Sequence, residues 1–167
     1  SPIINTGKFG TSLNDTNGNE VIKFTATSSA VNELTIANGA STTGPTLSAT
    51  GSGANLDVIL AGKGTGAVNI AKAAFAAATM TGDGAVSGTA TYIIGNKGST
   101  LVATMANGTV VGEYKIFTNK GVGALQVTPT SFSQGTSFTL AQHDGCTCIW
   151  DGTNWSLVGN QGEVTVA

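Results

Sequence analysis

The residues best suited to chemistry in this chain lie in one short run, HDGCTC at 143–148. His143, Asp144, Cys146 and Cys148 are side-chain types that bind zinc. Their spacing differs from that of most zinc sites, because one residue separates the thiols and the sequence has no second Cys or His cluster. Residues two apart in a strand point to one face and are poorly placed to form a disulfide with each other. We therefore interpret both cysteines as buried, reduced thiols; a metal site and an intersubunit disulfide are the alternatives.

Groups suited to hydrolysis are scattered along the chain. His143 is the only histidine, there is no Gly-x-Ser-x-Gly elbow, and the nine acidic residues form no evident pair. The glycine-rich run 62–66 fails the phosphate-loop pattern, because Gly64 stands where Ser or Thr is required and Asp57 where the first glycine belongs. The sequence therefore predicts a protein with neither an enzymatic activity nor a cofactor.

Two tryptophans flank a tight turn near the C-terminal end of the sequence. Trp150 and Trp155 enclose the run DGTN at 151–154, which is typical of a hairpin turn. Aromatic faces suit sugar rings, so the pair is a candidate outer binding surface for a glycan. Tryptophans beside a hairpin more commonly pack in a core or an interface, which is the alternative.

The composition of the chain indicates its fold class and excludes some kinds of partner. The 167 residues are 40% hydrophobic and only 10% charged, with 24 glycines and no arginine. So few charges argue against disorder and favour an all-β chain with many turns and with surfaces hidden in an assembly. A net charge of −2 and the lack of arginine argue against direct nucleic-acid binding. No apolar run approaches the roughly 18 residues of a membrane span, so no membrane partner is expected.

The segment 17–70 reads as a series of short β pieces. Small apolar groups, mostly with a spacing near two, are separated by turn signals such as the Asn-Gly pairs at 17–18 and 38–39. Strands this short bury too little area to offset their backbone entropy alone, so the segment is predicted to be a scaffold that associates with identical copies. Its candidate interface residues are Val21, Ile22, Phe24, Leu34, Ile36, Val58 and Leu60.

Three further segments complete the predicted organisation. Residues 1–16 form an N-terminal arm that either docks on a partner through Ile3, Ile4 and Phe9 or is a flexible end. Residues 71–84 are an Ala- and Gly-rich connector that is long enough for one or two helical turns. Residues 85–167 form a second β module, an antiparallel sandwich or barrel. Its predicted strands are Gly88–Ile94, Thr100–Met105, Glu113–Thr118, Ala124–Thr128, Ser137–Leu140, Thr147–Trp150, Trp155–Val158 and Glu163–Val166.

Two stretches resemble segments of small bacteriophage structural proteins. One runs from NGNEVIKFTATSSAVNELTIANG to PTLSATGSGANLDVILAGKGTGAVNI, and the other is FSQGTSFTLAQHDGCTCIWDGTNWSLVG. Together they cover about half of the chain, and neither is a catalytic motif. The resemblance is to head-decoration, head-fibre and tail-fibre proteins, and it implies a homotrimer at the virion surface. A long fibre would carry many shaft repeats, whereas this chain has one short scaffold and one compact module.

The expected protein is therefore an all-β homotrimer, with an extended, intertwined N-terminal β segment and a C-terminal module. Its expected function is that of a non-enzymatic capsid decoration, cement or head-fibre protein, which binds the major capsid protein on the outer surface of the head. The first alternative is a tail-fibre or receptor-binding protein that recognises a host surface glycan, and the second is a secreted lectin-like binding module of a bacterium.

Overall fold

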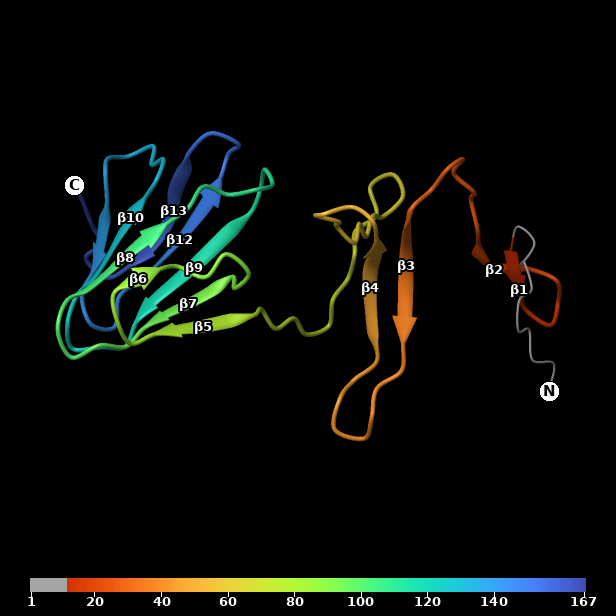
Figure 1. Cartoon of the computed structure of the whole chain (residues 1–167), viewed down its shortest axis with the longest axis horizontal. Coiled ribbons are helices and arrows are strands. Elements are labelled where there is room, and N and C mark those ends of the chain that lie inside the picture. Colours follow the sequence, from red (N-terminus) through yellow and green to blue (C-terminus); the bar gives the residue numbers. More distant parts are fainter. Residues whose placement is uncertain (1–11) are drawn as a thin grey trace. The chain divides into compact units, whose positions relative to one another are not determined.

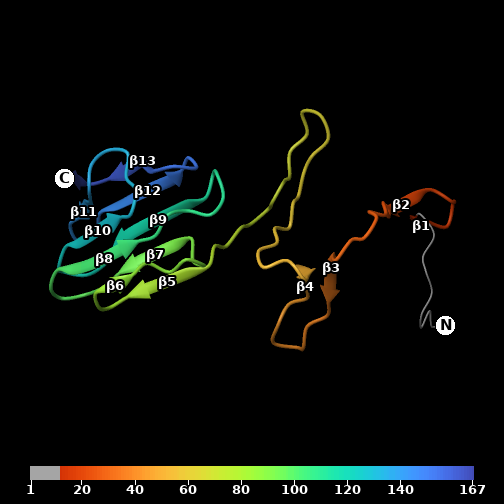
Figure 2. The same cartoon turned by 45° about the horizontal axis from the view of Figure 1, so that its top comes forward.

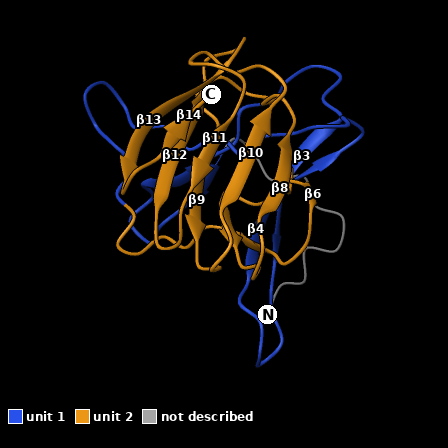
Figure 3. Ribbon diagram, turned by 90° about the vertical axis from the view of Figure 1, so that its left-hand side faces the viewer, with its two compact units in different colours: residues 1–69 blue, residues 70–167 orange. Residues whose placement is uncertain are grey.

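The computed structural model describes residues 12–167 and is all-β, with no helix in that range. The chain divides into two compact units, residues 1–69 and residues 70–167 (Figure 3). The predicted boundary between scaffold and connector lies one residue away from this division. Each unit is described by itself.

Two separate hairpins make up the secondary structure of the described part of the first unit, residues 12–69 (Figure 1). β1 (Ser12–Asn14) pairs antiparallel with β2 (Glu20–Lys23), and β3 (Asn32–Ala37) pairs antiparallel with β4 (Thr46–Gly51). The first turn is held by Asp15, whose Oδ1 accepts hydrogen bonds from the backbone N of Asn17 and Asn19 at 2.9 and 2.8 Å. The second hairpin carries a cross-strand hydroxyl pair, Thr35 and Thr50, whose Oγ1 atoms lie 2.6 Å apart.

The apolar groups at 56–60 and 68–70 do not form the strands that their spacing predicts. Residues 52–76, all of which the structure describes, contain no strand. A strand requires a hydrogen-bonded neighbour, and the backbone hydrogen bonds outside the strands include none to residues 54–61. The apolar pattern is therefore present without a pairing partner among the residues that the structure describes.

The second unit contains two five-stranded sheets. Sheet I has the order β13–β12–β9–β7–β5 and consists of β5 (Ala77–Met80), β7 (Tyr92–Gly95), β9 (Tyr114–Asn119), β12 (Gly145–Trp150) and β13 (Trp155–Gln161). Sheet II has the order β14–β11–β10–β8–β6 and consists of β6 (Gly84–Ala85), β8 (Leu101–Met105), β10 (Leu125–Pro129), β11 (Phe138–Leu140) and β14 (Thr165–Val166). Each strand range predicted for 85–167 overlaps one of the strands β7 to β14.

The prediction of an antiparallel module is wrong for half of this unit. From β5 to β10 the chain alternates between the sheets, so β5, β7 and β9 run parallel in sheet I and β6, β8 and β10 run parallel in sheet II (Figure 2). The pairs β5–β6, β7–β8 and β9–β10 are three successive coils of a stack. Strands β11 to β14 add antiparallel neighbours at the end formed by β9 and β10. Alternating residues specify which face of a strand is buried, but they do not specify the direction of its neighbours.

The segment predicted as a connector, 71–84, contributes strands to this stack. Its residues Ala77–Met80 form β5, which pairs in parallel with β7 in the register Ala78↔Ile93, and its last residue begins β6. A helix of one or two turns is marginal by itself, whereas strand pairing here also brings Ala78 and Met80 against the core. Tertiary pairing thus overrides the local helix preference of alanine.

One hydrophobic core lies between sheets I and II. Phe117 of sheet I meets Phe138 of sheet II edge to face, with ring centroids 5.3 Å apart. The core consists of Val86, Ala90, Ile93, Leu101, Ala103, Met105, Phe117, Leu125, Val127, Phe138, Leu140, Cys146, Cys148, Trp150 and Trp155.

Two polar side chains share the inward face of β9 with Phe117. Lys115 is 4% exposed, and its Nζ donates to the carbonyl oxygens of Ser87, Gly88 and Ala90 at 3.1, 3.2 and 2.6 Å. Asn119 is 2% exposed, donates from Nδ2 to the carbonyl oxygens of Gly123 and Leu140, and accepts from the N of Gly121. Both are fully paired, as burial of a polar group requires.

Asp83 joins the turn before β6 to sheet II and gives the fold a testable dependence on pH. Its Oδ1 accepts from Lys97 Nζ at 2.7 Å and from the backbone N of Val102 at 2.9 Å. These hydrogen bonds, with that from Lys97 the larger cause, lower the pKa of Asp83 from its ordinary value of 3.8.

Because the folded-state pKa is lowered, the Asp83 carboxylate stabilises the fold above the ordinary value, and the contribution is lost as the pH falls through the folded pKa. We expect Asp83→Asn to lose less thermal stability than the wild type between about pH 5 and about pH 3. Thermal melts at fixed protein concentration measure the difference. Equal losses in both proteins would contradict the role of Asp83, since Asp15 and Asp151 are present in each.

Candidate interaction surfaces

The two tryptophans are core residues and not an outer surface. Trp150 and Trp155 face each other across the β12–β13 hairpin, with ring centroids 5.6 Å apart, and are 5% and 1% exposed. Trp155 Nε1 donates to the carbonyl oxygen of Ala106 at 2.9 Å, which satisfies its polar group. The structure thus corrects the glycan-surface interpretation in favour of packing, because strand alternation places Trp150 on the inward face with Cys146 and Cys148.

The run 143–148 does not bring its chemical groups together. Cys146 and Cys148 are buried and free, as predicted, whereas His143 lies at the surface. Two causes raise the pKa of the Cys146 thiol: the larger is a hydrogen bond with Cys148, and the second is burial. The raised pKa makes this thiol a poor nucleophile at neutral pH. The Asp144 carboxylate accepts a hydrogen bond from the backbone N of Ala141. Within residues 12–167, no three His, Cys, Asp or Glu side chains are grouped as a metal site would require.

The predicted interface residues of the first unit are exposed apolar side chains. Between residues 12 and 69, the structure shows no buried residue of any type. Ile36 is 75% exposed and Leu60 is 62% exposed; the others of the set are Val21, Ile22, Phe24, Leu34 and Val58. Ile3, Ile4 and Phe9 lie outside the described residues. Residues 12–69 therefore have an apolar surface but no core.

A groove of about 320 Å³ lies within the first unit, beside the β3–β4 hairpin. Leu34 of β3 and Leu47 of β4 share one face of the hairpin, and both are about half exposed. The strand-free residues Leu56 to Leu60 form the opposite side of the groove. This arrangement brings Leu34, Val58 and Leu60 of the predicted set to one place.

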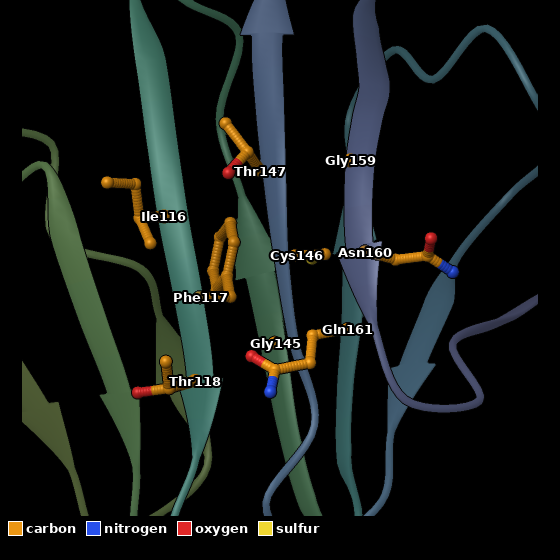
Figure 4. A pocket seen from close by; sticks show the side chains of 9 residues that line it. All are labelled: Ile116, Phe117, Thr118, Gly145, Cys146, Thr147, Gly159, Asn160 and Gln161. Atoms are coloured by element: carbon orange, nitrogen blue, oxygen red, sulfur yellow. The ribbon is translucent and has the colours of Figure 1, made fainter.

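The outer face of sheet I was not identified from the sequence. Two shallow depressions lie on it, each of about 340 Å³, and Ile116 and Thr118 line both. One is further lined by Phe75 and Tyr92. The other is shown in Figure 4, and the rest of its lining consists of Phe117, Gly145, Cys146, Thr147, Gly159, Asn160 and Gln161. The alternation of Tyr114, Ile116 and Thr118 could have indicated this face, but it does not say which side of the strand faces the core.

Comparison with known proteins gives neither a matching family model nor a match among the curated proteins. In the part of the chain that is described, no helix has the length and apolar character needed to cross a membrane.

Proposed function

We propose that this chain is a non-enzymatic structural protein of a bacteriophage virion, which forms a homotrimer and binds the outer surface of the capsid. In this role it is a decoration or cement protein whose partners are its own copies and the major capsid protein. The two stretches that resemble phage structural proteins support the proposal; they include β2 to β4 in the first unit and β11 to β13 in the second.

The observation that carries the proposal is the absence of a core between residues 12 and 69 in the single chain. Isolated two-stranded hairpins are marginally stable at best, and burial of apolar area supplies about 25 cal/mol per Å². The exposed apolar residues, the groove beside β3 and β4, and the strand-free segment 52–76 can therefore be stabilised together by association. Identical copies of the chain can serve as partners for one another, and closed cyclic symmetry keeps such an assembly finite.

The second unit supplies the outward part of the proposed trimer. Its two sheets enclose a single core, so this unit has the means to stay folded without the capsid. Attachment of the first unit across a junction between capsid subunits would tie these subunits together. Apolar burial and strand pairing supply the energy of attachment, because charges are too few to steer it.

Immunogold labelling of intact phage particles with an antibody against residues 85–167 tests the proposed location. We expect gold over the whole head surface in electron micrographs. Particles of a mutant phage that lacks the protein serve as the control, and we expect them to release their genome at a lower temperature than wild-type particles. Gold confined to the tail would overturn the capsid-decoration proposal.

A further inference from the structure

We infer that the outer face of sheet I is a second self-association surface, which packs against another copy of this chain. The inference deepens the proposed function, because it rests on the homotrimer and adds to its interface a surface of the second unit. All the interface residues predicted from the sequence lie at or before Leu60, so this surface is separate from them.

The outer faces of the two sheets differ in chemistry. Most outward residues of sheet II are hydroxyl- or amide-bearing: Thr104, Gln126, Thr128, Thr139 and Thr165, with Ala85 and the 42% exposed Val102 as exceptions. Most outward residues at the centre of sheet I are aromatic or aliphatic: Tyr92, Ile94, Tyr114, Ile116 and Ile149, with Thr118, Gly145 and Thr147 as exceptions. Strand register places Tyr92 beside Ile116, and Ile116 beside Thr147, in one row across the sheet.

The absence of charge on this face favours another copy over a charged partner as the cover. Lys115 is the only charged residue in the five strands of sheet I, and it points into the core. Around a symmetry axis each charge meets its own copy, so an uncharged face is compatible with such an axis. An acidic or basic partner would find no complementary group among the strand residues of this face.

Phe75 lies at the edge of this surface and links it to the apolar residues that precede it in the sequence. Its ring is 50% exposed and meets Tyr114 edge to face, with centroids 5.6 Å apart. Phe75 also lines the depression with Tyr92 and Ile116, which gives a partner side chain a place to insert. Along the chain Val68 and Ile70 come shortly before it, and both are exposed.

The test is sedimentation velocity of the full chain over a range of protein concentrations. We expect a wild-type trimer, and we expect Ile116→Glu to raise its dissociation constant at least about tenfold, because three carboxylates would face one another. Gln126→Glu places the same charge on the outer face of sheet II and is the matched control, for which we expect no change. Near-UV circular dichroism of the buried tryptophans verifies that each variant keeps its core.

A parallel set of variants separates this inference from the proposed function. Leu34→Asp alters only the surface of the first unit. If Leu34→Asp dissociates the trimer and Ile116→Glu does not, the inference is overturned while the proposed first-unit interface stands. If Ile116→Glu alone dissociates it, the inference stands and the first-unit interface is wrong. A wild-type chain that remains monomeric at every concentration overturns both.

An oxidative crosslink identifies the contacting face directly. Thr118→Cys, on the outer face of sheet I, is expected to form an intermolecular disulfide, whereas Thr128→Cys, on the outer face of sheet II, is not. Both variants keep the buried cysteines, so the wild type shows the background. Crosslinking through position 128 without crosslinking through position 118 would show that sheet II is the contacting face and would overturn the inference.

Discussion

Replacement of Trp155 by alanine is expected to lower the free energy of unfolding of the second unit by about 3–5 kcal/mol. The indole is 1% exposed, packs against the Trp150 ring and is held by a hydrogen bond to the carbonyl oxygen of Ala106. Truncation removes the transfer free energy of the largest fully buried side chain, opens a cavity, and leaves the Ala106 oxygen without its indole donor.

Urea unfolding, followed by the fluorescence of the remaining Trp150, measures this loss. Protein concentration must be equal throughout, because the stability of an oligomer depends on it. Trp155→Phe is the matched control: it keeps an aromatic ring and loses the N–H donor, so its cost should be about 1–2 kcal/mol. A Trp155→Ala variant within about 0.5 kcal/mol of the wild type is typical of an exposed ring and would contradict the packed hairpin.

Replacement of Lys115 by methionine is expected to lower the free energy of unfolding by about 3 kcal/mol. Methionine keeps much of the apolar stem, so the loss comes from the ammonium group. That group donates to the carbonyl oxygens of Ser87, Gly88 and Ala90, and it holds the loop that follows β6 against β9. Of these acceptors Ala90 lies in the core, where an unpaired carbonyl is most costly.

A variant of the neighbouring acidic residue, Glu113→Gln, is the control for Lys115→Met. Glu113 Oε1 lies 3.6 Å from the ammonium, and the other carboxylate oxygen of Glu113 accepts from the backbone N and the hydroxyl of Thr109. We therefore expect Glu113→Gln to cost less than about 1 kcal/mol in the same urea experiment. Equal losses for Glu113→Gln and Lys115→Met would show that the ion pair, and not the three carbonyl contacts, stabilises the loop.

Much of the second unit could be predicted from residue alternation and turn signals. Cys146, Cys148 and Trp150 were assigned to one strand face, and the structure buries all three. The pattern of β9 could not be interpreted in the same way. Tyr114, Ile116 and Thr118 on one side look as suitable for a core as Lys115, Phe117 and Asn119 on the other, and only the second set is buried.

The remaining differences between the prediction and the structure have the same physical origin: the local sequence does not specify which strands pair with each other. The alanines of β5 and the two residues of β6 carry little strand preference, and their strands exist because β7 and β8 offer parallel edges. Conversely, Val58 to Leu60 have the apolar character of a strand and lack a strand partner within residues 12–167. The surface on sheet I could not be predicted for a related reason, since it depends on which side of each strand the opposite sheet covers.

The coil stack of the second unit also has a consequence for the order in which the unit opens. The first coil, β5 and β6, pairs only with the second, β7 and β8, and β6 is only two residues long. At the other end, antiparallel hairpins brace the third coil, β9 and β10. In an array with nearest-neighbour contacts, loss of structure begins at the least supported end. Amide-exchange protection should therefore rise along the stack from Ala77 toward Phe117, so that the second unit frays first at the end that comes earliest in the sequence.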